Sequence, residues 1–116
     1  MDRAGTNTLL VLTTLPDAAT AKSIAASLVG ERLASCVNVL GGCMSVYRWK
    51  GAVEEAQEVP VLIKTNADRY ADLEAAIRRL HPYEVPEIIA LRVVDGLPEY
   101  LSWVSQETAA ASSAAG

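Results

Sequence analysis

The stretch "CMSVYRWKGAVEEAQEVPVLIKTN", residues 43–66, contains two extended segments that meet at a short turn. Both segments are rich in β-branched and aromatic side chains, which is typical of β-strands. Lys50 and Gly51 between them can form a tight turn, because glycine accepts the positive φ that two-residue turns require. The middle of the chain therefore predicts a long hairpin, with Tyr47 and Trp49 on one of its faces.

The chain before this hairpin is extended as well. "ASCVNVL", residues 34–40, leads through Gly41 and Gly42 into the first hairpin strand, and paired glycines within a strand pattern usually mark a bulge or a bend. We therefore expect one long, kinked strand up to the turn. Pro60 in the returning strand cannot donate a hydrogen bond to a neighbouring strand, so we expect it at an edge or a bulge.

A strand and a helix precede these extended segments. "TLLVLTT", residues 8–14, is short, apolar on both faces and β-branched, which predicts a buried strand. Apolar residues then recur at spacings of three and four over residues 18–32, which predicts a helix. Asp17 is placed to act as its N-cap.

A second helix, a strand and a short helix follow the hairpin. Asp68 is the expected N-cap of the second helix, and Pro82 ends it, because the residue before a proline, here His81, is disfavoured in helical conformation. Its expected apolar stripe consists of Tyr70, Leu73, Ile77 and Leu80. "EIIALRVV", residues 87–94, predicts the last strand, and residues 95–106 predict a short helix with a proline in its first turn.

The predicted order is βαββαβ followed by a short helix. This is the split βαβ pattern of a ferredoxin-like α+β sandwich, here with an extra C-terminal helix. A chain of 116 residues has the size of one domain. We expect a single domain over residues 1–116, folded over about 8–107, with a flexible tail of small residues at 108–116.

Apolar residues on both faces of the predicted sheet indicate self-association. Two helices cover one face of such a sheet, yet several strands leave both faces apolar. The pairs that carry this pattern are Leu10 and Leu12, Val37 and Val39, and Ile89 and Leu91. Because the C-terminal tail is too short and too polar to cover the second face, we expect identical chains to cover it, with the hairpin and the last helix reaching across to neighbours.

The composition narrows the class of protein. With 51% apolar and 21% charged residues, the chain is expected to fold as a globule. Its net charge of -4, with lysines and arginines scattered singly, predicts no nucleic-acid partner. No apolar run reaches the roughly 18 residues that cross a bilayer, and residues 1–17 lack the pattern of a secretion signal. We therefore expect a cytoplasmic protein with no membrane partner, in which Cys36 and Cys43 are free thiols.

The chain lacks the motifs of common enzyme classes. It has no P-loop, no GxGxxG, no CxxC, no HExxH and no nucleophile elbow, and His81 is its only histidine. A single imidazole with no positioned partner gives little support for hydrolytic or acyl-transfer chemistry. We therefore expect no enzymatic activity and name no catalytic residue.

"ASCVNVL", "YRWKGAVEEAQEV", "LIKT" and "HPYEVPEIIALRVVDGLPEYLSWV" resemble the CutA family of divalent-cation tolerance proteins. The resemblance covers residues 9–104, and its most specific part is HPYEVPE followed by LPEYL. It implies a ferredoxin-like protomer assembled as a homotrimer, with a role in tolerance of copper and other divalent ions. The trimer is similar in architecture to PII signalling proteins, which bind small effectors in clefts between subunits.

His81 and Cys36 are the candidate metal ligands. Imidazole binds copper and zinc, and a thiolate favours Cu(I) or zinc over magnesium or calcium. The alternatives are a histidine that only ends a helix, where the dipole favours an imidazolium, and a cysteine that packs as a small hydrophobe. A specific transition-metal site needs three or four ligands, so it would have to be shared between chains. Some relatives carry a cysteine at the position of Thr13 and a second histidine at that of Leu80, which implies a weaker or differently built site here.

Tyr47, Trp49, Lys64, Tyr83 and Glu84 are among the recognisable positions of the family and are candidates for an intersubunit cleft. Aromatic side chains beside single charges suit either a small-molecule cleft or a subunit interface. The alternative to a metal-tolerance role is therefore a PII-like sensor or adaptor, in which these residues bind a small anion or organic ligand. A purely structural scaffold with no ligand is the third alternative.

The acidic residues of the returning strand are expected on a solvated face of the hairpin. Glu58 is the exception, because it leads into the apolar run before Lys64. These two residues share strand parity, but about 20 Å of strand separates them. Each is therefore expected to have a different partner.

Overall fold

The computed structural model describes residues 6–110 and shows an antiparallel sheet with helices packed on it. The strands are β1 (Thr8–Leu15), β2 (Cys36–Val39), β3 (Cys43–Trp49), β4 (Ala52–Asn66) and β5 (Ile88–Arg92). The helices within this range are α1 (Ala18–Gly30), α2 (Tyr70–Leu80) and α3 (Pro98–Glu107), with a 3-10 turn, η2 (Ala67–Arg69), before α2. The predicted α+β class, with an antiparallel sheet and a C-terminal helix, is confirmed.

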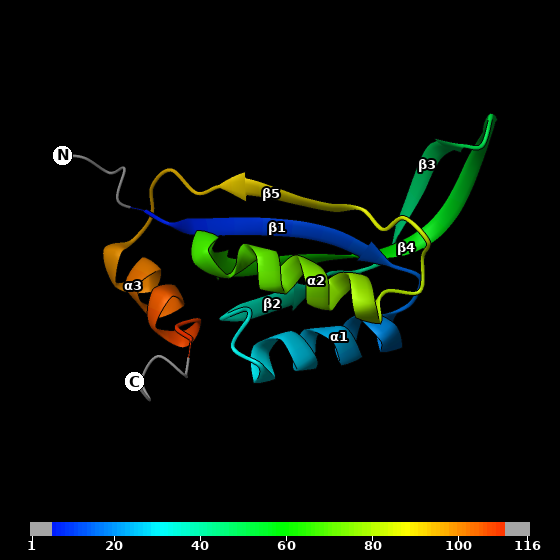
Figure 1. Ribbon diagram of the computed structural model, residues 1–116. Helices are drawn as coiled ribbons and strands as arrows, with labels where there is room; N and C mark the ends of the chain where they lie inside the picture. The colour runs from blue at the N-terminus through cyan, green and yellow to red at the C-terminus, as the bar shows by residue number, and fades with distance from the viewer. Residues whose placement is uncertain (1–5, 111–116) are drawn as a thin grey trace.

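β4 organises the sheet. Its second half lies between β1 and β2, and β5 pairs with the other edge of β1, so the strand order is β2-β4-β1-β5. The register places Leu12 of β1 opposite Leu62 of β4 and Ile89 of β5. The first half of β4 pairs only with β3, and this β3–β4 hairpin projects from one end of the sheet (Figure 1).

The predicted kinked strand is present as two strands, β2 and β3, on the same edge of β4. Between the pairs Val39–Val61 and Cys43–Glu58 the chain advances four residues on one side and three on the other, which is a bulge of one residue. The Pro60 carbonyl accepts a 2.9 Å hydrogen bond from the Leu40 N–H. The nitrogen and the carbonyl of a strand residue face the same side. The position where Pro60 lacks an N–H group therefore lies at the bulge, which is where proline is expected in a sheet.

The two long helices begin differently. The Thr20 N–H donates to Asp17 Oδ1 at 2.7 Å, so the predicted N-cap of α1 is confirmed, and hydrogen bonds from Thr20 lower the pKa of Asp17. The predicted N-cap of α2 is wrong. Asp68 lies inside η2 and accepts a hydrogen bond from Asn7 at 3.1 Å instead, because the chain enters α2 through a 3-10 turn. The predicted end is confirmed, since His81 is extended, with ψ at 135°.

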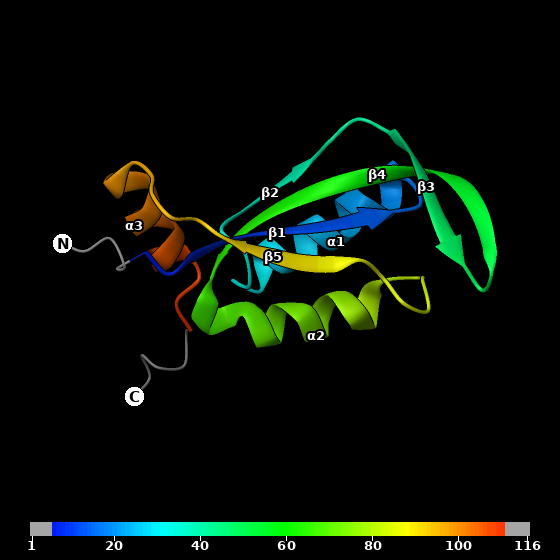
Figure 2. The same ribbon diagram turned by 90° about the horizontal axis from the view of Figure 1, so that it is seen from above.

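α3 lies at the end of the sheet opposite the hairpin and is held by the residues that follow α1 (Figures 1 and 2). Arg32, which has a positive φ of 61°, donates to the Gln106 carbonyl at 2.7 Å and to the Ala109 carbonyl at 3.3 Å. These bonds satisfy carbonyls near the C-terminus of α3, which have no partner within the helix. Thr108, the first residue of the predicted flexible tail, is buried against Val104, and residues 111–116 lie outside the described residues.

The two faces of the sheet differ in cover. α1 and α2 pack against one face, and Figure 2 shows α1 behind β1 and α2 beside β5. The covered face forms the core, which includes Val11, Leu15, Leu28, Ile63, Leu73 and Ile77, whereas Leu80 of the predicted stripe is exposed. On the open face Ile89 and Leu91 are 48% and 53% exposed, so the predicted apolar second face is present. No helix in residues 6–110 is long and apolar enough to cross a membrane.

Candidate functional site

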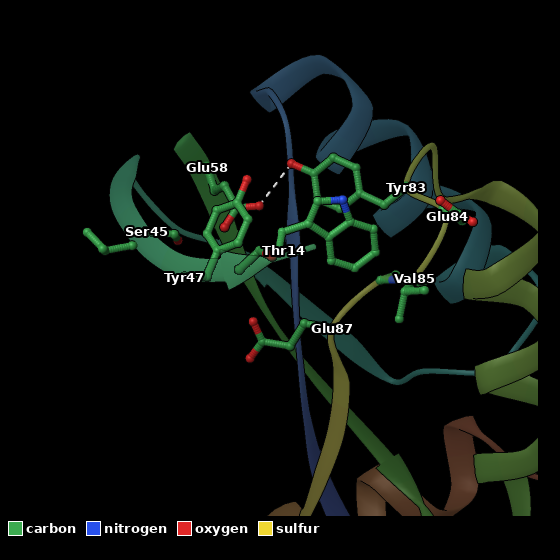
Figure 3. Close-up of a pocket in the computed structure, with 11 residues that line it drawn as sticks. Thr14, Ser45, Tyr47, Glu58, Tyr83, Glu84, Val85 and Glu87 are labelled. Atoms are coloured by element: carbon green, nitrogen blue, oxygen red, sulfur yellow. Dashed lines mark hydrogen bonds between the residues drawn. The ribbon is translucent and has the colours of Figure 1, made fainter. Parts of the chain in front are cut away.

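A pocket of about 720 Å³ opens where the hairpin leaves the sheet. Tyr47 and Trp49 of β3, Glu58 of β4 and Tyr83 in the turn between α2 and β5 line it, and Figure 3 shows Tyr47 and Glu58 on the hairpin side with the Tyr83 hydroxyl directed at Glu58. The other lining residues are Thr14, Ser45, Val46, Glu84, Val85, Pro86 and Glu87. The strand pairing of the hairpin and the prolines of the turn together shape this concave surface.

His81 ties the turn to β1 rather than projecting into the pocket. It is buried, and its Nε2 lies 2.7 Å from the Thr14 carbonyl oxygen. Its Nδ1 accepts a 3.1 Å hydrogen bond from the Tyr83 N–H. A carbonyl can only accept, so Nε2 carries a hydrogen and Nδ1 supplies the lone pair. Both ring nitrogens are therefore used within the chain, and a metal ion could bind only by displacing one of these bonds.

Tyr83 and Glu58 join the turn to β4. The Tyr83 hydroxyl donates to Glu58 Oε2 at 2.9 Å, and the Tyr83 ring is tilted against His81 with 4.7 Å between centroids. Burial, followed by the hydrogen bond to Glu58 and the charge of that carboxylate, raises the pKa of Tyr83 from 10.0 to about 12. The phenol therefore stays protonated as the donor throughout the neutral range.

Lys64 lies away from this pocket, which four of the five predicted cleft residues line, and the predicted cleft between subunits stays a prediction. Its register partners are Leu10 and Cys36, on the open face of the sheet. Its ammonium contacts Asn38 Oδ1 and lies 3.9 Å from Cys36 Sγ. Glu58 and Lys64 thus have separate partners, as the length of strand between them predicts. Their shared strand parity predicts that both side chains leave the same face of β4, but it does not show which end of the strand carries the pocket.

Cys36 and His81 do not form a shared site within one protomer. Cys36 is level with Leu10 across the sheet, and His81 bonds Thr14, four residues further along β1 or about 13 Å away. Metal–ligand bonds are about 2.0 to 2.3 Å long, so this separation is far too great. Across residues 6–110, no three side chains of His, Cys, Asp or Glu come close enough together to hold a metal ion.

Sequence reasoning missed several lining residues of the pocket. Thr14 and Ser45 had no distinguishing signal, because each is a small polar residue in a strand. Glu58 had one, since it was the acidic residue that needed a separate partner. Its partner, Tyr83, is 25 positions away, and only the folded chain brings the two together.

The fold and the pocket define a small α+β protein in which an antiparallel sheet presents an open face and a projecting hairpin. The family model of the CutA1 divalent ion tolerance protein matches residues 9–107. Divalent-cation tolerance protein CutA from Thermus thermophilus is 46% identical over 99 residues, covering 85% of this chain and 96% of that protein. The protein of the same name from Yersinia pestis is 44% identical, covering 85% and 83%. The chain belongs to the CutA1 divalent ion tolerance protein family.

Solved structures of this family share the fold. A divalent cation tolerance protein from Thermus thermophilus superposes with a TM-score of 0.86 at 45% identity, covering 88% of this chain and 99% of that chain. CutA from Xylella fastidiosa also gives 0.86, at 46% identity, covering 89% and 99%. A structure from Archaeoglobus fulgidus, described as a periplasmic divalent cation tolerance protein, gives 0.85 at 29% identity, covering 88% and 99%.

Proposed function

We propose that this chain forms a cytoplasmic homotrimer of ferredoxin-like protomers that supports tolerance of copper and other divalent metal ions. The observation that carries the assembly is the apolar face left uncovered by the helices. Burying one exposed leucine or isoleucine side chain contributes roughly 1.5 to 3 kcal/mol. Ile89 and Leu91 on this face, and Val46 and Val53 on the hairpin, are all exposed in the single chain. Identical neighbours would remove these side chains from water.

The assembly can be tested by light scattering coupled to size exclusion. We expect a mass three times that of the 12.3 kDa protomer at micromolar concentration. Leu91→Glu places a charge on the open face and should lower the mass without loss of helical signal. Val29→Glu makes the same change at an exposed position on α1 and should leave the mass unchanged. A monomeric parent protein would refute the trimer.

The metal role is proposed from family membership and from donors that assembly could bring together. Cys36 is a half-buried thiol on the open face, where a neighbour could add further ligands. A thiolate in such a site would favour Cu(I) or zinc. His81 would have to exchange its bond to Tyr83 or to Thr14 for the metal, so its contribution requires a rearranged turn.

Calorimetric titration with Cu(I), Cu(II) and Zn(II) separates these contributions. Saturable heats that vanish in Cys36→Ser would support a thiolate site, and heats lost in His81→Ala would support the rearranged turn. Cys43→Ser is the matched control, because Cys43 is an exposed thiol on β3. Complementation of a copper-sensitive strain lacking its own family member then tests the tolerance role. Equal nonspecific heats in all variants would exclude metal binding.

A small-molecule sensor, similar to PII proteins, is the second candidate function, and the pocket favours it. A volume of about 720 Å³ lies within the range of small-ligand sites, and its walls combine aromatic rings with a few polar groups. A ligand present at about 100 times its dissociation constant should add roughly 2.7 kcal/mol to the free energy of unfolding. A thermal-shift screen of metabolites would therefore detect it, and a screen without stabilising compounds would count against the sensor.

A further inference from the structure

The charged side chains that line the pocket have one sign. Glu58, Glu84 and Glu87 are the charged members of its described lining, and no lysine or arginine belongs to that set. An anion in this pocket would lie among carboxylates and meet repulsion rather than attraction. Lys64 is the one cation among the five residues proposed from the sequence for a small anion or organic ligand, and it lies on the open face of the sheet instead.

Glu58 is the most buried of these three residues, with an exposed fraction of 8%, so its charge is the least screened by water. Its hydrogen-bond donor is the Tyr83 hydroxyl, which is neutral, and within residues 6–110 neither lysine nor arginine pairs with it. A buried carboxylate without a counter-ion loses hydration that a single neutral donor replaces only in part. A cationic ligand would supply the missing counter-charge.

The aromatic rings of the pocket have the same electrostatic preference. Tyr47 and Trp49 come from β3 and Tyr83 comes from the turn, so rings from two separate elements line the pocket. The face of an aromatic ring is negative and attracts ammonium groups within about 6 Å. Trp49 already has such a contact, since the Lys50 ammonium lies 5.5 Å from the centroid of its ring.

The spacing of the carboxylates distinguishes an organic cation from a metal ion. A divalent ion needs several oxygen ligands within about 2.0 to 2.6 Å of one point. Glu58, Glu84 and Glu87 line one pocket, yet across residues 6–110 no three acidic, cysteine or histidine side chains converge in this way. A larger cation can contact separated carboxylates and rings together, and the volume of the pocket leaves room for an apolar group.

We propose that this pocket binds an organic ammonium ion with an apolar portion, its charged head directed at Glu58 and its apolar part held between the aromatic rings. The inference rests on the second candidate function, the small-molecule sensor, and specifies its ligand class. It does not depend on the metal role, and all the lining residues from which it is argued belong to one chain.

The test compares three small probes that share a phenyl ring and differ in charge. Phenethylammonium, 2-phenylethanol and 3-phenylpropanoate are titrated separately into the assembled protein by calorimetry, with ligand-observed NMR as a second readout. We expect saturable binding of phenethylammonium at one site per chain, with the alcohol at least about tenfold weaker because it lacks the charge-assisted interaction. 3-Phenylpropanoate should not bind, and raising the salt concentration should weaken the binding of phenethylammonium.

Variants place the binding at the pocket. Glu58→Gln should weaken phenethylammonium by about tenfold, the equivalent of one lost charge-assisted hydrogen bond. The double variant Glu84→Gln/Glu87→Gln changes only exposed side chains, so it remains informative if Glu58→Gln folds poorly. Glu99→Gln is the control, because it removes one negative charge from α3 at the far end of the molecule (Figure 1). Its affinity should equal that of the parent protein.

Four results would overturn the inference. Equal binding of all three probes would mark the pocket as merely apolar, and tighter binding of 3-phenylpropanoate would keep the sensor but reverse the ligand charge. Displacement of phenethylammonium by equimolar zinc would reassign the carboxylates to a metal. Absence of saturable binding by any probe at millimolar concentration would count against both the ligand class and the sensor, while the trimer would still be judged by its mass.

Discussion

The two halves of β4 form one continuous strand but have different surroundings. Residues 59–66 lie between β1 and β2 and bury Val61, Ile63 and Thr65 under the helices. Residues 52–57 pair only with β3, and nearly all of their side chains are exposed. The same extended backbone is therefore core in one half and surface in the other. Neighbouring elements, rather than strand propensity, decide what each half contributes to stability.

The two halves of β4 meet at a junction that one turn of the chain holds in place. Glu58 is the last residue of the hairpin half, and Thr14 is opposite Pro60 at the start of the core half. Tyr83 bonds the first and His81 bonds the second, so one turn is attached to both sides of the junction. The hairpin is thereby held at the sheet by polar contacts and has no buried core of its own.

The largest expected loss of stability comes from a substitution in the core half of β4. Ile63→Ala removes a fully buried side chain and should lower the free energy of unfolding by about 2 to 5 kcal/mol. Urea denaturation at fixed protein concentration measures this loss. A loss below about 1 kcal/mol would show that the core half is not the main source of stability.

A substitution at the junction should cause the second-largest loss in the free energy of unfolding. His81→Ala leaves the Thr14 carbonyl and the Tyr83 N–H without their partner, and we expect a loss of about 2 to 3 kcal/mol in the same urea experiment. Lys22→Ala on the exposed surface of α1 is the control and should change stability by less than about 0.5 kcal/mol. If His81→Ala matched that control, the imidazole would not be a structural link.

Tyr83→Phe tests the other side of the junction. It removes the donor to Glu58 and should cost about 1 to 2 kcal/mol at pH 8. In the folded parent the pKa of Tyr83 is raised to about 12, so the folded state holds this proton more tightly than the unfolded state, whose pKa is near 10. The contribution is therefore complete below pH 10 and is lost as the pH rises toward 12. The difference in stability between parent and variant should shrink over that window, and a constant difference would contradict the assignment.

The smallest expected effect is at the tip of the hairpin. Lys50 and Gly51 have φ values of 50° and 85°, the conformation that a two-residue turn requires. Gly51→Ala meets no steric obstacle but forces a side chain into this region, at a cost of about 1 kcal/mol. Lys50→Asn should change stability by less than about 0.5 kcal/mol, because asparagine accepts positive φ more readily but the contact of the Lys50 ammonium with the Trp49 ring is lost. Thermal unfolding in which Gly51→Ala cost no stability would show that neighbours, and not the turn, set the hairpin geometry.

Local patterns predicted the elements well where one residue dictates its own surroundings. Asp17 caps α1, Pro82 ends α2, and Lys50 with Gly51 turns the hairpin, because each acts through a backbone group only a few positions away. The predicted N-cap of α2 was wrong because the chain enters this helix through the 3-10 turn η2, where Asp68 accepts a hydrogen bond from Asn7, a residue distant in sequence. Leu80 failed for a similar reason, since the last turn of α2 extends beyond the core that buries Leu73 and Ile77.

The sequence by itself determined the α+β class, the order of strands and helices, the hairpin and the apolar second face, because these follow from periodicity and from local turn and cap chemistry. Tertiary structure alone decided the site. It joined Tyr83 to Glu58, separated Lys64 from the aromatic residues, and occupied both nitrogens of His81. The physical reason is that hydrogen bonds and pockets depend on distances in space between residues far apart along the chain, and a one-dimensional pattern does not contain those distances.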